Sequence, residues 1–170
     1  MPFFGSGGRK KRAAVAWSSA IRGGKSILFT GHRLVALDTS VWIYHFEGSV
    51  VYGQAADRVL EAVAQARIGA VASELVLLEL LVAPLKQGSQ DVADEIELAL
   101  LHFPHLQLAP VTRAVLMRAA EIRARYRLHT PDAIMLATAV ESGATLAVTN
   151  DSAWRKVGDI EVLLLRDLNK

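Results

Sequence analysis

Apolar segments of two kinds alternate along the chain from residue 34 onward. Short, almost wholly apolar runs predict buried strands at residues 34–37, 70–72, 106–111, 144–148 and 161–165. Longer segments carry apolar residues at helical spacing and predict helices at residues 50–66, 74–83, 91–103, 113–126 and 130–142. Strands that alternate with helices favour an α/β fold, in which helices cover both faces of a parallel sheet.

Local signals predict where two of these helices begin and end. Ser73 is expected to cap the helix that starts at residue 74, and Pro84 is expected to stop it, because proline lacks a backbone N–H. Thr130 is expected as the N-cap of the last long helix, with Pro131 at its first position. Gly143 supplies the left-handed residue on which that helix ends.

Charge divides the 170 residues into two parts. The first 33 residues contain seven basic residues and no acidic one, whereas the rest holds twelve basic and seventeen acidic residues, a net charge of −5. We therefore predict a basic, flexible N-terminal extension over residues 1–33 and one folded domain over residues 34–170. The extension is either a solvated leader or an arm that binds nucleic acid, and the leader is the commoner case.

Composition excludes several classes of protein. No cysteine occurs, which rules out disulfides, thiolate metal sites and a cysteine nucleophile. The apolar runs are much shorter than the roughly 20 residues that a membrane span needs. Residues 13–30 contain basic residues and make a poor signal-peptide core. We therefore expect a cytoplasmic protein that does not associate with a membrane.

Four acidic residues stand inside apolar segments or at their edges, where a charge is costly: Asp38, Glu79, Asp132 and Asp151. Asp38 and Asp151 follow predicted strands. Glu79 lies on the helix after the second strand, and Asp132 lies in the first turn of the last long helix. Ligands of open α/β sheets bind beyond the carboxyl ends of the strands, so all four side chains can converge on one rim.

Each of these residues also has a purely structural explanation. Asp38 and Asp151 can belong to turns, and Asp132 can favour a helix dipole. Glu79 can face solvent if its helix exposes one stripe, although the apolar residues on both sides argue for burial. Their joint occurrence favours a functional site.

Several carboxylates on one rim repel one another unless a cation compensates their charge. Oxygen ligands suit Mg²⁺ or Mn²⁺, which accepts one or two carboxylates and keeps bound water. Such a centre can activate water for the hydrolysis of a phosphodiester. The pattern therefore predicts a metal-dependent nuclease, with a non-catalytic module that binds RNA or protein as the alternative.

Four short motifs occur in order along the chain. They are LVALDTSVWIYHFE at residues 34–47, Ala72-Ser73 with Glu79 six residues after Ser73, TPDA at residues 130–133 and VTND at residues 148–151. Together they resemble the PIN-domain nucleases, most closely the VapC-type toxins of toxin–antitoxin pairs. The resemblance spans residues 34–170, and it implies a PIN-like three-layer α/β/α fold around a twisted, mainly parallel sheet.

The resemblance also implies roles for individual residues. The four acidic residues match the family's acidic positions, with Asp38 and Asp132 as the direct metal ligands. Ser40 and Thr149 match the family's supporting hydroxyls, and Asn150 matches the polar residue beside the last aspartate. The implied activity is that of a Mg²⁺-dependent (or Mn²⁺-dependent) endoribonuclease, the toxin of a type II toxin–antitoxin system. The implied partners are an RNA substrate, a small antitoxin and a second copy of the chain.

An acidic rim on an acidic domain is a poor attractor for RNA, so basic side chains must hold the phosphates. Candidates are Arg155 and Lys156, the basic face of residues 113–127, and the extension. Three aromatic residues flank the acidic ones: Trp42, Tyr44 and Trp154. They can stack on unpaired bases, although core packing is the commoner role.

Overall fold

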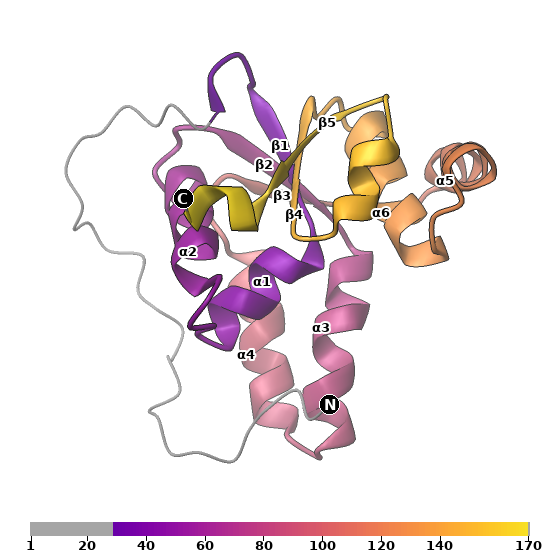
Figure 1. Ribbon diagram of the computed structural model, residues 1–170. Helices are drawn as coiled ribbons and strands as arrows, with labels where there is room; N and C mark the ends of the chain where they lie inside the picture. Colours follow the sequence, from indigo (N-terminus) through magenta and orange to yellow (C-terminus); the bar gives the residue numbers. More distant parts are fainter. Residues whose placement is uncertain (1–28, 170) are drawn as a thin grey trace.

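The computed structural model describes residues 29–169, which form one α/β unit (Figure 1). Residues 1–28, with most of the predicted extension, lie outside the described residues, and the boundary at residue 34 stays a prediction. The strands are β1 (Leu34–Leu37), β2 (Gly69–Ser73), β3 (Leu106–Ala109), β4 (Leu146–Thr149) and β5 (Glu161–Leu164). The α-helices are α1 (Thr39–Phe46), α2 (Gly53–Ala64), α3 (Leu75–Lys86), α4 (Gln90–Leu101), α5 (Arg113–Tyr126) and α6 (Thr130–Glu141). Two short 3-10 helices are η2 (Ser152–Lys156) and η3 (Leu165–Asn169).

The five strands form one sheet in the order β3-β2-β1-β4-β5, and every pairing is parallel. This confirms the predicted α/β class and the three-layer arrangement. The first two crossovers run from β1 outward to β3, whereas the chain then returns to the other side of β1 to form β4. The strand order therefore reverses between β1 and β4, which is the place where open α/β sheets bind ligands.

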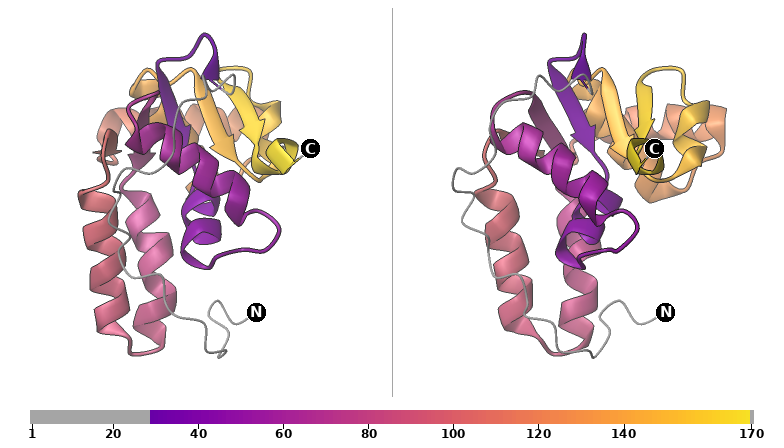
Figure 2. Two further views of the ribbon diagram at one scale, coloured as in Figure 1. Left: turned by 90° about the vertical axis from the view of Figure 1, so that its left-hand side faces the viewer. Right: turned by 60° about the vertical axis from the view of Figure 1, so that its left-hand side comes forward.

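Helices cover both faces of the sheet. Helices α1 and α2 lie on one face, and the α5–α6 pair lies on the other (Figure 2). Helices α3 and α4 pack against each other as an antiparallel pair that extends well beyond the sheet, as both views of Figure 2 show. The core between the layers is mainly aliphatic, and its fully buried side chains include Val35, Trp42, Leu60, Leu136, Trp154 and Leu164.

Most predicted elements occur within a few residues of their expected positions. Helix α1 was not predicted, because Val41 to Phe46 is almost continuously apolar and lacks a clear helical period. The prediction that Pro84 stops α3 was wrong: the helix continues to Lys86 with Pro84 buried in its last turn. The Pro84 carbonyl still accepts hydrogen bonds from the backbone N–H groups of Gln87 and Ser89, so only the donor that proline lacks is lost.

Two caps differ slightly from prediction and one agrees. Helix α6 begins at Thr130 with His129 as its N-cap, one residue earlier than expected. The N-cap position of α3 is Glu74, one residue after the predicted Ser73. Ser73 Oγ still accepts a hydrogen bond from the Leu75 N–H, so it does satisfy a donor in the first turn of α3. Gly143 has φ +77°, the left-handed conformation expected at the end of α6.

No helix within residues 29–169 has both the length and the apolar character needed to cross a membrane.

Candidate functional site

Asp38 follows β1 directly, at the point where the strand order reverses. Its backbone N–H bonds to the carbonyl of Val148 in β4 at 3.0 Å, which continues the β1–β4 pairing by one residue. Its Oδ2 accepts hydrogen bonds from Ser40 Oγ at 2.6 Å and from Thr149 Oγ1 at 2.7 Å. The two hydroxyls predicted to support the site therefore both hold Asp38, one from α1 and one from β4.

Asp38 is a buried carboxylate, with 9% of its surface exposed. Burial raises the pKa of Asp38, and the hydrogen bonds from Ser40 and Thr149 oppose that rise because they favour the charged form. The two hydroxyls therefore hold the Asp38 carboxylate in place but do not offset the free-energy cost of burying its charge. A cation beside Asp38 would offset that cost.

Glu79 lies on the second turn of α3 and is half-buried, as its apolar surroundings predicted. Its Oε2 accepts a hydrogen bond from Thr39 Oγ1 at 2.5 Å, a contact between residues forty positions apart. Burial raises the pKa of Glu79, and the negative charges of Asp38 and Asp132 raise it further. Glu79 is therefore close enough to Asp38 and to Asp132 for their charges to oppose its ionisation.

Asp132 lies in the first turn of α6, half-buried, on the other side of the sheet from α1. Its Oδ1 accepts a hydrogen bond from the indole Nε1 of Trp154 at 3.1 Å. Trp154 is 1% exposed and belongs to η2. Its indole therefore packs in the core and also holds a carboxylate of the site.

Asp151 is more exposed than the other three acidic residues and serves as the N-cap of η2. Its Oδ1 accepts from the Ala153 N–H at 2.8 Å, and its own N–H donates to Thr149 Oγ1 at 3.0 Å. The structure therefore links Asp151 to the site through Thr149 and η2.

Asn150 joins three segments beside Asp38. Its backbone N–H donates to Ser40 Oγ at 3.2 Å, and its side-chain Nδ2 donates to the Tyr44 hydroxyl at 3.2 Å. Its Oδ1 accepts from the Arg166 N–H in η3 at 3.3 Å. Asn150 thus fixes the loop after β4 against α1 and η3.

Oxygen donors make up this site, and they suit a hard divalent cation. Among residues 29–169, however, no three acidic or histidine side chains are arranged as a ready metal cluster. The site still fits an ion that is held by two carboxylates and several waters, which is how proteins usually bind Mg²⁺. The burial of Asp38 and the repulsion of Glu79 by Asp38 and Asp132 are the observations that favour a cation there.

Two residues make direct contacts in this site that the sequence analysis did not predict. Thr39 lies within the Asp-Thr-Ser motif, so its hydroxyl was a visible candidate for a partner of Glu79. Trp154 stood close to Asp151 in the sequence, but nothing in that spacing indicated a contact with Asp132, 22 residues away.

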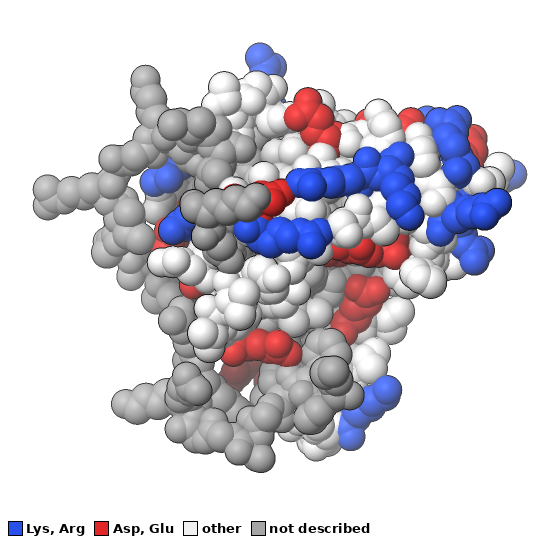
Figure 3. Space-filling view, in the orientation of Figure 1, with Lys and Arg blue, Asp and Glu red and all other residues white. Residues whose placement is uncertain are grey.

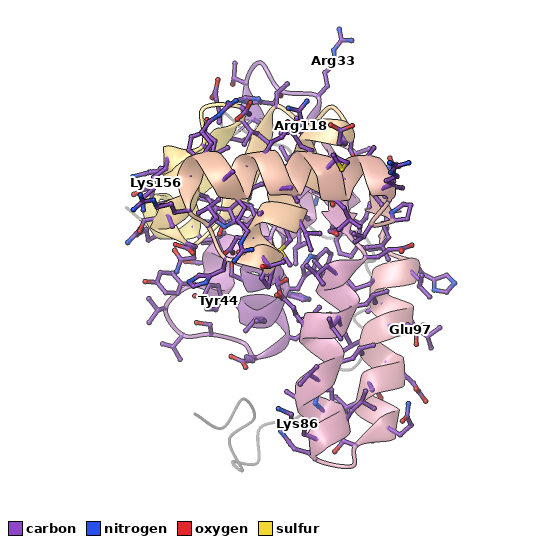
Figure 4. The ribbon with its side chains drawn as sticks, turned by 90° about the vertical axis from the view of Figure 1, so that its right-hand side faces the viewer. Arg33, Tyr44, Lys86, Glu97, Arg118 and Lys156 are labelled. Atoms are coloured by element: carbon purple, nitrogen blue, oxygen red, sulfur yellow. The ribbon has the colours of Figure 1, made fainter. Side chains whose placement is uncertain are left out.

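Basic side chains gather near the site on one side of the molecule. Figure 3 shows Lys and Arg side chains concentrated over the upper right of that face, with acidic side chains below them. Arg155 forms an ion pair with Asp167 of η3, and Lys156 is exposed at the end of η2. Figure 4 shows Lys156 on the main body and Lys86 at the far end of the α3–α4 pair.

The raised pKa values predict how pH affects stability. Folding raises the pKa of Asp38 and of Glu79 above their ordinary values of 3.8 and 4.5. In the metal-free protein their protonated forms therefore contribute fully to stability below the ordinary pKa values. This contribution is lost as pH rises through the pKa values of the folded protein. In urea titrations with chelator, we expect Asp38→Asn to flatten the gain in unfolding free energy on acidification, by at most about 1.4 kcal/mol per pH unit. Equal slopes for the two proteins would contradict a raised pKa at Asp38.

The fold and the carboxylate arrangement define a known class of domain. The family model of the PIN domain matches residues 35–160, and the chain belongs to the PIN domain family. A comparison with curated proteins gave no match.

Solved structures with the same fold include three toxin–antitoxin complexes. VapBC2 from Rickettsia felis, bound to a DNA fragment from its promoter, has a TM-score of 0.63 at 16% identity and covers 77% of this chain and 98% of its own. DNA-bound VapBC from Salmonella typhimurium has a TM-score of 0.60 at 15% identity, covering 78% and 98%. A toxin–antitoxin complex from Klebsiella pneumoniae has a TM-score of 0.58 at 20% identity, covering 77% and 97%. At these identities the similarity concerns the fold.

Proposed function

We propose that this PIN domain is a metal-dependent endoribonuclease, and that it is the toxin of a type II toxin–antitoxin system. The observation that carries the proposal is the buried Asp38 beside Glu79, a half-buried carboxylate that both Asp38 and Asp132 repel, at the reversal point of the sheet. The family match and the fold shared with VapBC complexes support it.

In this proposal each polar residue has a distinct task. Asp38 and Asp132 would hold Mg²⁺ or Mn²⁺, which neutralises phosphate charge and provides an activated water when bound. Ser40 and Thr149 keep Asp38 in one orientation, and Asn150 fixes the loop that carries Thr149. Glu79, held by Thr39, orients water at the site, and its raised pKa suits it to accept a proton. Asp151, the fourth acidic residue, would complete or position the hydration of the ion together with Glu79.

A cleavage assay on total RNA with mapped ends tests the proposal. We expect discrete cleavage products with Mg²⁺ or Mn²⁺ and none with chelator. A site variant that is expressed and purified separately in the same way controls for contaminating nuclease. Uncut RNA at millimolar concentrations of both ions would contradict the proposal.

The second candidate is a PIN-like module that binds RNA or protein without cutting. The absence of a three-ligand cluster among residues 29–169 is the observation in its favour. Calorimetry separates the two functions, because the module would bind RNA while failing to bind Mn²⁺.

Arg155 and Lys156 are proposed to hold phosphates of the RNA. We expect Lys156→Ala to weaken the binding of a single-stranded RNA and to reduce the slope of log affinity against log salt by about 0.7. Lys86→Ala is the matched control, because Lys86 is an exposed lysine at the remote end of the α3–α4 pair (Figure 4). Equal effects of the two substitutions would remove Lys156 from the RNA-binding surface.

Partner proteins are proposed from the exposed apolar surface of α3 and α4. Leu78, Val82 and Leu85 follow one another at helical spacing on α3, and Leu78 is 61% exposed. Leu98 and Leu101 are exposed on α4. Adjacent apolar side chains of this size typically mark a protein interface. We propose that a small antitoxin and a second copy of the chain bind this domain.

A further inference from the structure

One indole hydrogen bond distinguishes Trp154 from the other tryptophan of the core. Trp42 and Trp154 are each 1% exposed, so both indole rings are fully enclosed. Trp154 Nε1 donates to Asp132 Oδ1 at 3.1 Å, whereas Trp42 Nε1 is buried with no partner among the described residues. The indole N–H of Trp154 therefore donates to a carboxylate. No other donor among residues 29–169 bonds to the second oxygen of Asp132, Oδ2.

Two hydrogen bonds to Asp151 hold the turn that carries Trp154. The Asp151 Oδ1 accepts from the Ala153 N–H at 2.8 Å, and the Asp151 carbonyl accepts from the Trp154 N–H at 3.3 Å. An aspartate at this position stabilises the first turn because its oxygen satisfies a backbone donor that has no partner within the helix. Without the cap, η2 loses the contact that fixes its start.

The same segment also reaches Asp38. The Asp151 N–H donates to Thr149 Oγ1 at 3.0 Å, and Thr149 Oγ1 donates to Asp38 Oδ2 at 2.7 Å. A run of hydrogen bonds therefore connects Asp38, Thr149, Asp151, Ala153 and, through the indole of Trp154, Asp132. Asp38 directly follows β1 and Asp132 lies at the start of α6, and this segment contacts both.

We propose that Asp151 is a positioning residue, which acts on the metal site by capping η2 and so placing the Trp154 indole N–H on Asp132. Trp154 is the second positioning residue. Its indole N–H restrains rotation of the Asp132 carboxylate, which would help to hold the ion. The proposal rests on the proposed metal-dependent function, and it assigns the fourth acidic residue a role other than that of a metal ligand.

The indole N–H signal tests the contact in the metal-free full chain, without any activity. The signals of Trp154 and Trp42 are assigned in ¹H–¹⁵N spectra with Trp154→Phe and Trp42→Phe. We expect Asp132→Asn and Asp151→Ala to shift the Trp154 signal while the Trp42 signal stays in place. A Trp154 signal that is unmoved by both substitutions would overturn the proposal.

Mn²⁺ affinity, measured by calorimetry, tests the consequence. Partners that orient a ligand typically contribute about 10–100-fold to metal affinity, so we expect Trp154→Phe and Asp151→Ala each to weaken Mn²⁺ binding by about 10-fold. Trp42→Phe is the matched control, because it removes an equally buried indole whose N–H bonds to nothing in the described structure, and it should not change the affinity.

Two further variants separate positioning from direct ligation. Asparagine caps a helix as well as aspartate does, so Asp151→Asn should weaken Mn²⁺ binding far less than Asp151→Ala. The double variant Trp154→Phe, Asp151→Ala should lose no more affinity than either single variant, since both act through one contact. Equal losses for the Asn and Ala variants, or additive losses in the double variant, would overturn the proposal. Failure of the wild type to bind Mn²⁺ would instead refute the proposed function, and the indole signal would still decide how Asp132 is held.

Discussion

Asp38→Asn is expected to reduce RNA cleavage by about 1,000-fold or more. Metal ions contribute several kcal/mol of transition-state stabilisation, and each 1.36 kcal/mol corresponds to a factor of ten. The substitution keeps the shape of the side chain and an oxygen that can accept from Ser40 and Thr149, but it removes the charge that would hold the ion. Rates on a mapped cleavage site, with and without Mn²⁺, measure the effect.

Asp94→Asn is the matched control for this experiment. Asp94 is an exposed residue of α4 whose Oδ1 accepts from Gln90, so its replacement changes charge by the same amount away from the site. We expect wild-type cleavage from the control and an unchanged circular dichroism spectrum from both variants. Full activity of a folded Asp38→Asn protein would refute the assignment of the site.

A divalent cation is expected to stabilise the folded protein strongly. At neutral pH the metal-free site holds carboxylates that burial and mutual repulsion disfavour, so a bound ion removes an unfavourable interaction. An ion at 100 times its Kd adds about 2.7 kcal/mol to the free energy of unfolding, which corresponds to roughly 5–10 °C in Tm for a domain of this size. Thermal unfolding in MgCl₂ or MnCl₂, compared with NaCl of equal ionic strength, measures the shift.

The Asp38→Asn protein provides the comparison for stability as well. We expect its Tm to be higher than that of the wild type in chelator and to respond little to divalent ions, because the charge that requires compensation is gone. An equal rise in Tm for both proteins would place the stabilising ion somewhere other than this rim.

Much of the fold could be predicted from local pattern. Short apolar runs located all five strands, and the helical period located α5 at its observed bounds. Local pattern suffices there because the repeat of a strand or helix decides which residues of a segment face the core. The same reasoning missed α1, whose apolar residues are too continuous to show a period, and it ended α3 too early at Pro84. The first error arose because no local period was present, and the second because a proline in the last turn of a helix loses only its own N–H donor.

The sequence by itself determined which acidic residues stand in apolar surroundings and the order of the motifs around them. Only the tertiary structure decided which of those groups meet. Thr39 reaches Glu79 because α1 packs against α3. Thr149 reaches Asp38 and Trp154 reaches Asp132 because β4 returns to pair with β1, with η2 following it. Asp151 looked equivalent to the other three carboxylates in the sequence, but in the fold it caps η2. Contacts between distant segments depend on the strand order, and no local spacing of residues encodes that order.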